Sequence, residues 1–130
     1  MRPKQKRGFT LIEIMVVIVI ISLLAAIAIP NLLKAKISAN ESSTKGTLKS
    51  VANALENFAA LNQAYPTDTT QLIGASPPYL AIDYFTGSHF GYVFTSNLAA
   101  YSYTITATPL TTSSGTSTFT ITTGGIIQAF

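Results

Sequence analysis

One apolar run near the N-terminus limits what this chain can fold into. Residues 9–29 form a stretch of 21 residues with a single charged side chain, Glu13. An α-helix of that length spans ~31 Å, the thickness of the hydrocarbon core of a bilayer. Four of the eight Lys and Arg side chains precede the run (Arg2, Lys4, Lys6 and Arg7), so the positive-inside rule places the N-terminus inside. The run therefore predicts a single-pass membrane helix with the rest of the chain outside.

Three interpretations of this run are open. A secretory signal peptide is the first, because Ala26-Ile27-Ala28 has the small residues of a cleavage site. The run is longer than the ~7–15 apolar residues of such a signal, however. A plain membrane anchor is the second. Neither has a use for Glu13, because ionisable residues inside membranes are unfavourable and generally functional. The third interpretation gives Glu13 a role.

The residues around Glu13 form a specific motif. The stretch Gly8-Phe9-Thr10-Leu11-Ile12-Glu13 ends a basic leader, 1–8, and opens an apolar run that stops before Pro30. It resembles the class III signal of type IV prepilins and type II secretion pseudopilins. The resemblance implies that a prepilin peptidase cleaves between Gly8 and Phe9 and methylates the Phe9 amine, giving N-methylphenylalanine. It also implies that Phe9, Thr10, Glu13 and Pro30 serve assembly.

Electrostatics explains why such an assembly needs Glu13. N-methylation leaves the Phe9 amine cationic, and in a filament of staggered helices this amine can meet the Glu13 carboxylate of a neighbouring copy. A buried ion is tolerable when it is paired and unfavourable when it is not. The pair is therefore expected to fix the stagger between neighbouring copies.

The remaining residues, 30–130, have the pattern of one small head domain. Apolar residues at helical spacing predict that the helix continues to about Leu61, with a bend at Pro30. The expected buried face consists of Leu48, Val51, Ala52, Leu55, Phe58, Ala59 and Asn62. Residues 65–88, which include Pro77-Pro78, are expected to form a loop.

The apolar period changes to two over residues 89–130. This alternation predicts an antiparallel sheet of three or four strands, with a tight turn at Gly124-Gly125. The face expected to pack on the helix carries Phe90, Tyr92 and Phe94, then Tyr101, Tyr103 and Ile105, then Phe119 and Ile121. The predicted fold class is α+β: a long N-terminal helix, half transmembrane and half amphipathic, packed on a small antiparallel β-sheet. This is the layout of type IV pilins.

The sequence offers little for catalysis or metal binding. The chain has no cysteine, and His89 is its one histidine. Asp68 and Asp83 lie fifteen positions apart in the expected loop, with no spacing typical of paired-carboxylate catalysis. Residues 111–123 contain ten Ser or Thr and no acid, so the calcium loop that major pseudopilins usually carry is not expected. We therefore expect no enzyme activity, cofactor or metal.

Charge and modification signals are also weak. Without the leader, four cations face five carboxylates, which gives no support for a nucleic-acid partner. Asn40-Glu41-Ser42 matches an N-glycosylation sequon, which makes Asn40 a candidate glycosylation site.

The sequence is best interpreted as a structural subunit of a type IV pilus-like filament. The implied partners are copies of the chain, the prepilin peptidase, the inner membrane, and an assembly platform with its ATPase. A single-pass precursor in the inner membrane would then become an extracellular pilus. The alternative is a pseudopilin of a type II secretion system, in a periplasmic pseudopilus. A monomeric membrane-anchored binding module is a third possibility, and it would not require Gly8, Phe9 and Glu13 in register.

Overall fold

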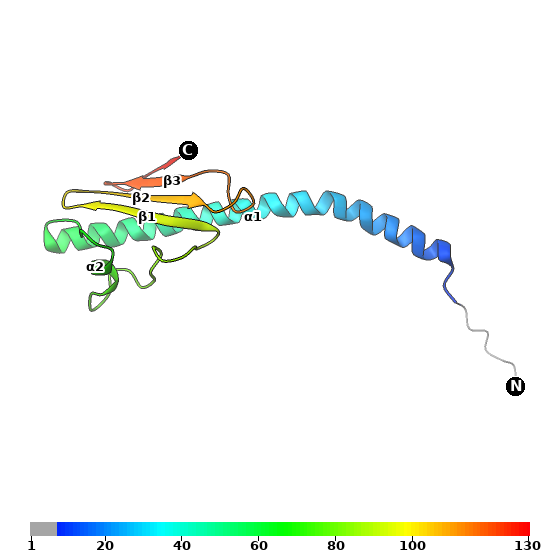
Figure 1. Cartoon of the computed structure of the whole chain (residues 1–130), viewed down its shortest axis with the longest axis horizontal. Helices are drawn as coiled ribbons and strands as arrows, with labels where there is room; N and C mark the ends of the chain where they lie inside the picture. The colour runs from blue at the N-terminus through cyan, green and yellow to red at the C-terminus, as the bar shows by residue number, and fades with distance from the viewer. Residues whose placement is uncertain (1–7) are drawn as a thin grey trace, which may run out of the picture. The chain divides into compact units, whose positions relative to one another are not determined.

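The computed structural model describes residues 8–130, so the basic side chains of the expected leader lie outside the described residues. The chain divides into two compact units, one ending at Lys34 and the other covering Ala35–Phe130. Helix α1, Leu11–Asn62, begins in the first unit and ends in the second (Figure 1). Its last residue is one position beyond the expected Leu61.

The first unit consists of the apolar part of α1. The helix continues through Ser22 and Pro30 without a break, and the Ser22 hydroxyl donates a hydrogen bond to the Ile18 carbonyl at 2.7 Å. The bend expected at Pro30 stays a prediction. The large apolar side chains of this unit are exposed, from Phe9 at 86% to Leu33 at 43%. Such a continuous apolar surface requires a membrane or other helices to cover it.

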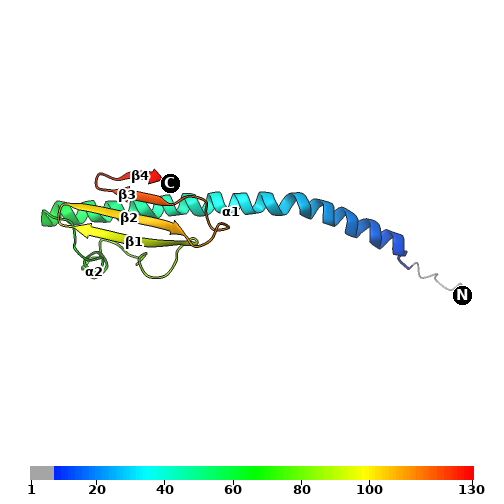
Figure 2. The same cartoon turned by 45° about the horizontal axis from the view of Figure 1, so that its top comes forward.

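The second unit confirms the predicted α+β fold class. After α1 come the short helix α2 (Thr70–Ile73) and the strands β1 (Tyr92–Ala99), β2 (Ser102–Pro109), β3 (Phe119–Thr122) and β4 (Ile126–Ala129). The strands form one antiparallel sheet in the order β1-β2-β3-β4, and one face of it lies along the C-terminal part of α1 (Figure 2). As predicted, Gly124 and Gly125 form the turn before β4, both with positive φ.

The core lies between this part of α1 and the sheet. Leu48, Val51 and Leu55 are fully buried, as the helical spacing predicted. Opposite them lie side chains that alternate along the strands: Tyr92 and Phe94 of β1, Tyr103 and Ile105 of β2, and Phe119 and Ile121 of β3. The prediction was wrong for Asn62, which is exposed and donates a hydrogen bond to the Phe58 carbonyl at 2.9 Å.

Two aromatic residues assigned to the inner face lie in turns instead. Phe90 and Gly91 have φ values of 55° and 76°, and they occupy a two-residue turn closed by two 2.9 Å hydrogen bonds between His89 and Tyr92. Tyr101 is 85% exposed in the turn that joins β1 to β2. The alternating pattern runs on into both turns, so the period alone could not tell a strand residue from a turn residue.

The Ser/Thr-rich loop between β2 and β3 is held against α1 and β1. The Asn40 side chain donates from Nδ2 to the Ser114 carbonyl at 2.9 Å, and the Tyr92 hydroxyl donates to the Ser117 carbonyl at 3.0 Å. Gly115 is buried against the hydroxyl end of the Tyr92 side chain. These contacts give a loop without charged side chains a fixed position.

Candidate functional site

The start of α1 is organised by a reciprocal contact between Thr10 and Glu13. The Glu13 atom Oε2 accepts hydrogen bonds from the Thr10 backbone N–H at 2.7 Å and from the Thr10 hydroxyl at 2.8 Å. The Glu13 backbone N–H in turn donates to the Thr10 hydroxyl oxygen at 3.3 Å. This is the capping box that Thr-x-x-Glu forms at a helix N-terminus. Glu13 therefore already has a role within a single chain.

Gly8 and Phe9 lie before this cap and outside the helix. Both are exposed, and a Cβ built on Gly8 meets no atom within 4 Å. The peptide bond between them therefore belongs to an open segment, one residue before the Thr10 cap. A protease requires this accessibility, because a scissile bond inside a helix is closed to it.

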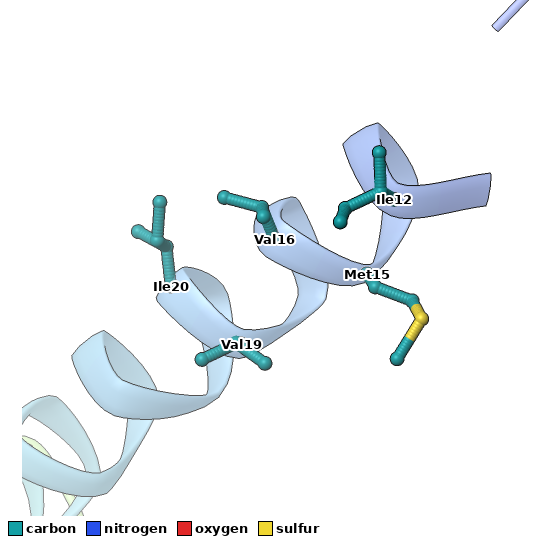
Figure 3. A pocket seen from close by; sticks show the side chains of 5 residues that line it. All are labelled: Ile12, Met15, Val16, Val19 and Ile20. Atoms are coloured by element: carbon teal, nitrogen blue, oxygen red, sulfur yellow. The ribbon is translucent and has the colours of Figure 1, made fainter. Parts of the chain in front are cut away.

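An apolar strip follows the cap along one side of α1. Ile12, Met15, Val16, Val19 and Ile20 line a shallow hollow there (Figure 3). They lie at steps of three and four, the spacing by which one helix packs against another. The helix is long and apolar enough to cross a membrane, by length and composition. The strip can therefore face lipid in one state and neighbouring helices in another.

The other predicted site residues do not join this cluster. Pro30 lies on the same helix but seventeen positions beyond Glu13. Asn40 uses its Nδ2 atom, the one that N-glycosylation would modify, in the hydrogen bond to Ser114. Glycosylation of Asn40 would have to break that bond.

The residues considered for catalysis are spread through the loop before β1. The hydroxyl of Thr86 lowers the pKa of Asp83, and the backbone N–H of Thr70 lowers that of Asp68. The ring of His89 packs against Tyr84 and Phe94, with centroids 5.2 and 6.5 Å away. Within residues 8–130, no group of three His, Cys, Asp or Glu is placed to hold a metal ion.

All five carboxylates accept hydrogen bonds from neutral groups of the chain itself. Glu41 binds Thr116, and Glu56 binds the hydroxyls of Tyr65 and Tyr103. Glu13, Asp68 and Asp83 bind Thr10, Thr70 and Phe85, respectively. The carboxylates thus stabilise the fold of the chain.

Comparison with known proteins agrees with the motif. Residues 3–29 match the family model described as the prokaryotic N-terminal methylation motif. The chain is 43% identical over 67 residues to the type II secretion system core protein G of Pseudomonas aeruginosa, covering 52% of this chain and 47% of that protein. It is 42% identical over 73 residues to the type IV major pilin protein PilA of Myxococcus xanthus, covering 56% of this chain and 33% of PilA. About half of the chain is thus similar to type IV pilins and type II secretion pseudopilins.

Each of these similarities covers about half of the chain. The core protein G of Escherichia coli K12 is 44% identical over 63 residues, which cover 48% of this chain. The pilin-like chain spans less than half the length of each of these relatives, at 47%, 33% and 43%. Their names describe a secretion-system core protein and a major pilin.

Sequence reasoning gave Glu13 an intermolecular role and overlooked its intramolecular one. The signal was present, because Thr-x-x-Glu before an apolar run is the sequence pattern of a capping box. No comparable signal predicted the contacts of Glu41 and Asn40 with the loop between β2 and β3. These pairs lie 75 and 74 positions apart, and only the folded chain brings them together.

Proposed function

We propose that this pilin-like chain is a structural subunit of a helical filament, processed between Gly8 and Phe9 and polymerised through the helix that follows. The observation that carries the proposal is the combination of an exposed apolar helix with one carboxylate near its start, inside the matched methylation motif. The partners would be other copies of the chain, the prepilin peptidase in the inner membrane, and an assembly platform with its ATPase.

The geometry of Glu13 supports a pairing role after cleavage. Both hydrogen bonds from Thr10 go to Oε2, which leaves Oε1 available for a further donor. In the filament that donor would be the methylated Phe9 ammonium of a neighbouring subunit. Thr10 would orient the carboxylate while the ammonium neutralises it, so that no unpaired charge is buried.

Two measurements test this function. Mass spectrometry of the N-terminus of the mature protein should find methylated Phe9. A start at Ile29 would indicate a signal peptide, and an intact Met1 would indicate an unprocessed anchor. Sedimentation of sheared surface or periplasmic material should then recover the chain in polymers. A processed chain recovered only as monomer would contradict the filament.

Two forms of filament fit this subunit. An extracellular type IV pilus is supported by the similarity to PilA, and a periplasmic pseudopilus by the similarity to core protein G. Deletion of the gene separates them. Loss of surface fibres with normal protein secretion would assign a pilus, and loss of secretion without loss of fibres would assign a pseudopilus.

A further inference from the structure

A groove opens between α1 and the last strand of the sheet. Its volume is about 390 Å³, and it is lined by Lys45 and Lys49 of α1 and by Phe119, Gly125, Ile127 and Ala129 of the β3–β4 hairpin. Strand β4 is the edge strand of the sheet (Figure 2). One wall of the groove is thus cationic, and the other is the inner face of an edge strand.

The register of β4 identifies which backbone groups point to the open side. Thr118 and Phe130 form a hydrogen-bonded pair, in which each backbone N–H donates to the carbonyl of the other at 2.9 Å. Along an antiparallel ladder such pairs alternate with pairs that are not hydrogen-bonded to each other, and Phe119–Ala129 and Ile121–Ile127 are of the second kind. The backbone N–H and C=O groups of Ile127 and Ala129 therefore point away from β3. These are the two β4 residues that line the groove. An incoming backbone would meet hydrogen-bonding groups and apolar side chains together.

Strand β4 lacks the usual protection of an edge. Edge strands are commonly blunted by charged side chains, prolines or bulges, because an open edge pairs with other chains. The four residues of β4 are Ile, Ile, Gln and Ala, and Ile126 is 63% exposed. This edge is therefore competent to accept another strand.

The charge of the groove restricts its partner. Lys45 and Lys49 are exposed and lie one helical turn apart, with the Lys45 ammonium 4.8 Å from the centre of the Phe119 ring. Glu41, one turn before Lys45, directs its carboxylate to Thr116. The other carboxylates likewise accept hydrogen bonds from groups of the same chain. Glu41 also interacts with the charge of Lys45, which helps to lower the pKa of this carboxylate, so the negative charge that would match both lysines has to come in part from outside the subunit.

We propose that this groove binds an extended segment of a partner protein, which adds to the edge of β4 and places acidic side chains beside Lys45 and Lys49. Strand addition supplies backbone hydrogen bonds, and alternate side chains supply specificity. A second copy paired through its own β4 would bring two further lysines toward this groove. Charge complementarity thus favours an acidic partner strand over a second copy. The inference does not depend on whether the chain polymerises.

The test uses the full chain in detergent micelles and a short peptide of alternating valine and glutamate. Binding is followed by fluorescence anisotropy and by the amide resonances of Ile127 and Ala129. We expect binding that slows hydrogen exchange at these two amides. In the variant Lys45→Gln/Lys49→Gln, which removes both charges and keeps polar side chains of moderate length, affinity should fall about tenfold. The control Lys34→Gln/Lys36→Gln removes the same charge outside the groove and should bind like the wild type.

Several results would overturn the proposal. Absence of binding is one, and equal binding of a valine–lysine peptide is another, because the charge of the partner would then be wrong. Equal binding of a backbone N-methylated peptide would reveal charge attraction without strand addition. Protection of Ile127 and Ala129 that rises with protein concentration alone would assign the edge to a second copy of the chain.

Discussion

The Glu41 atom Oε1 accepts hydrogen bonds from the backbone N–H and the hydroxyl of Thr116, at 3.0 and 2.9 Å. The two residues are 75 positions apart, one on α1 and the other in the loop between β2 and β3. A charged carboxylate thus holds a loop that has no charge of its own. The Asn40–Ser114 hydrogen bond one position earlier on the helix strengthens the same attachment.

Replacing Glu41 should weaken the fold in a pH-dependent way. The backbone N–H of Thr116 lowers the pKa of Glu41 below that of an unfolded chain, which is ~4.3. Its contribution to stability is therefore present above about pH 4.3 and lost as the pH falls through the lower folded pKa. Glu41→Gln should reduce the free energy of unfolding at pH 7 by about 1 kcal/mol, because solvent screens the partly exposed carboxylate and weakens its contribution. In urea unfolding of the full chain in micelles, the stability of this variant should fall less steeply at acid pH than that of the wild type. The same dependence of stability on pH in both proteins would contradict the contact.

Two glycines should respond in opposite directions to substitution by alanine. A Cβ on Gly115 would overlap the Tyr92 side chain, whose hydroxyl is fixed by its bond to Ser117. Gly115→Ala should therefore destabilise the head by about 1–3 kcal/mol. Gly46 lies within α1 with no atom near its Cβ position, so Gly46→Ala should stabilise by about 0.5–1 kcal/mol. Urea midpoints of the two variants provide the comparison, and equal shifts would show that the loop is not packed on Tyr92.

The buried hydroxyl of Tyr103 should matter most at high pH. It donates to Glu56 at 3.1 Å, and burial, followed by the charge of Glu56, raises its pKa. Its contribution is present below the ~10 of an unfolded tyrosine and is lost as the pH rises toward the higher folded pKa. Tyr103→Phe should reduce the free energy of unfolding by about 1 kcal/mol at pH 7. Above about pH 10, the stability of this variant should fall less steeply than that of the wild type. Denaturant titrations that show the same loss of stability above about pH 10 for the variant and the wild type would exclude this role.

The sequence predicted the helix and the strands because their patterns are local. The spacing of Leu48, Val51 and Leu55 reports one helix face, and the alternation of Tyr103 and Ile105 reports one sheet face. Turns were less predictable, because Phe90 and Tyr101 continue the alternation at positions where the chain reverses. The positive φ of Phe90 could not be predicted from its residue type, because phenylalanine rarely adopts this conformation.

Long-range polar contacts could not be predicted from local patterns. Glu41 and Glu56 looked like exposed helix residues, yet one binds a loop residue and the other binds two tyrosine hydroxyls. These pairings depend on the docking of the sheet on α1. The motif around Glu13, in contrast, is contiguous, and its resemblance to the prepilin signal could be recognised from the sequence alone.

Gly8→Val should block removal of the leader. No atom lies within 4 Å of a Cβ at Gly8, so the structure of the chain should tolerate a larger side chain there. A defect would then report recognition by the peptidase and not misfolding. Intact mass of the membrane-bound protein measures the outcome, with circular dichroism as the control for folding. Normal cleavage of this variant would contradict processing at the Gly8–Phe9 bond.

Substitutions at Thr10 and Glu13 separate helix capping from pairing between subunits. Glu13→Gln keeps an oxygen that can accept a hydrogen bond from Thr10 but removes the charge that would attract the Phe9 ammonium. Thr10→Val removes the hydrogen bonds of the Thr10 hydroxyl and keeps the charge of Glu13. If pairing drives assembly, Glu13→Gln and Glu13→Ala should both be processed yet yield few filaments, while Thr10→Ser should assemble like the wild type. Thr10→Val should fall between them, because the backbone N–H of residue 10 still orients the carboxylate. Filament yield after shearing is the measurement. Wild-type yield from Glu13→Gln, with reduced yield from Thr10→Val, would assign Glu13 to capping alone.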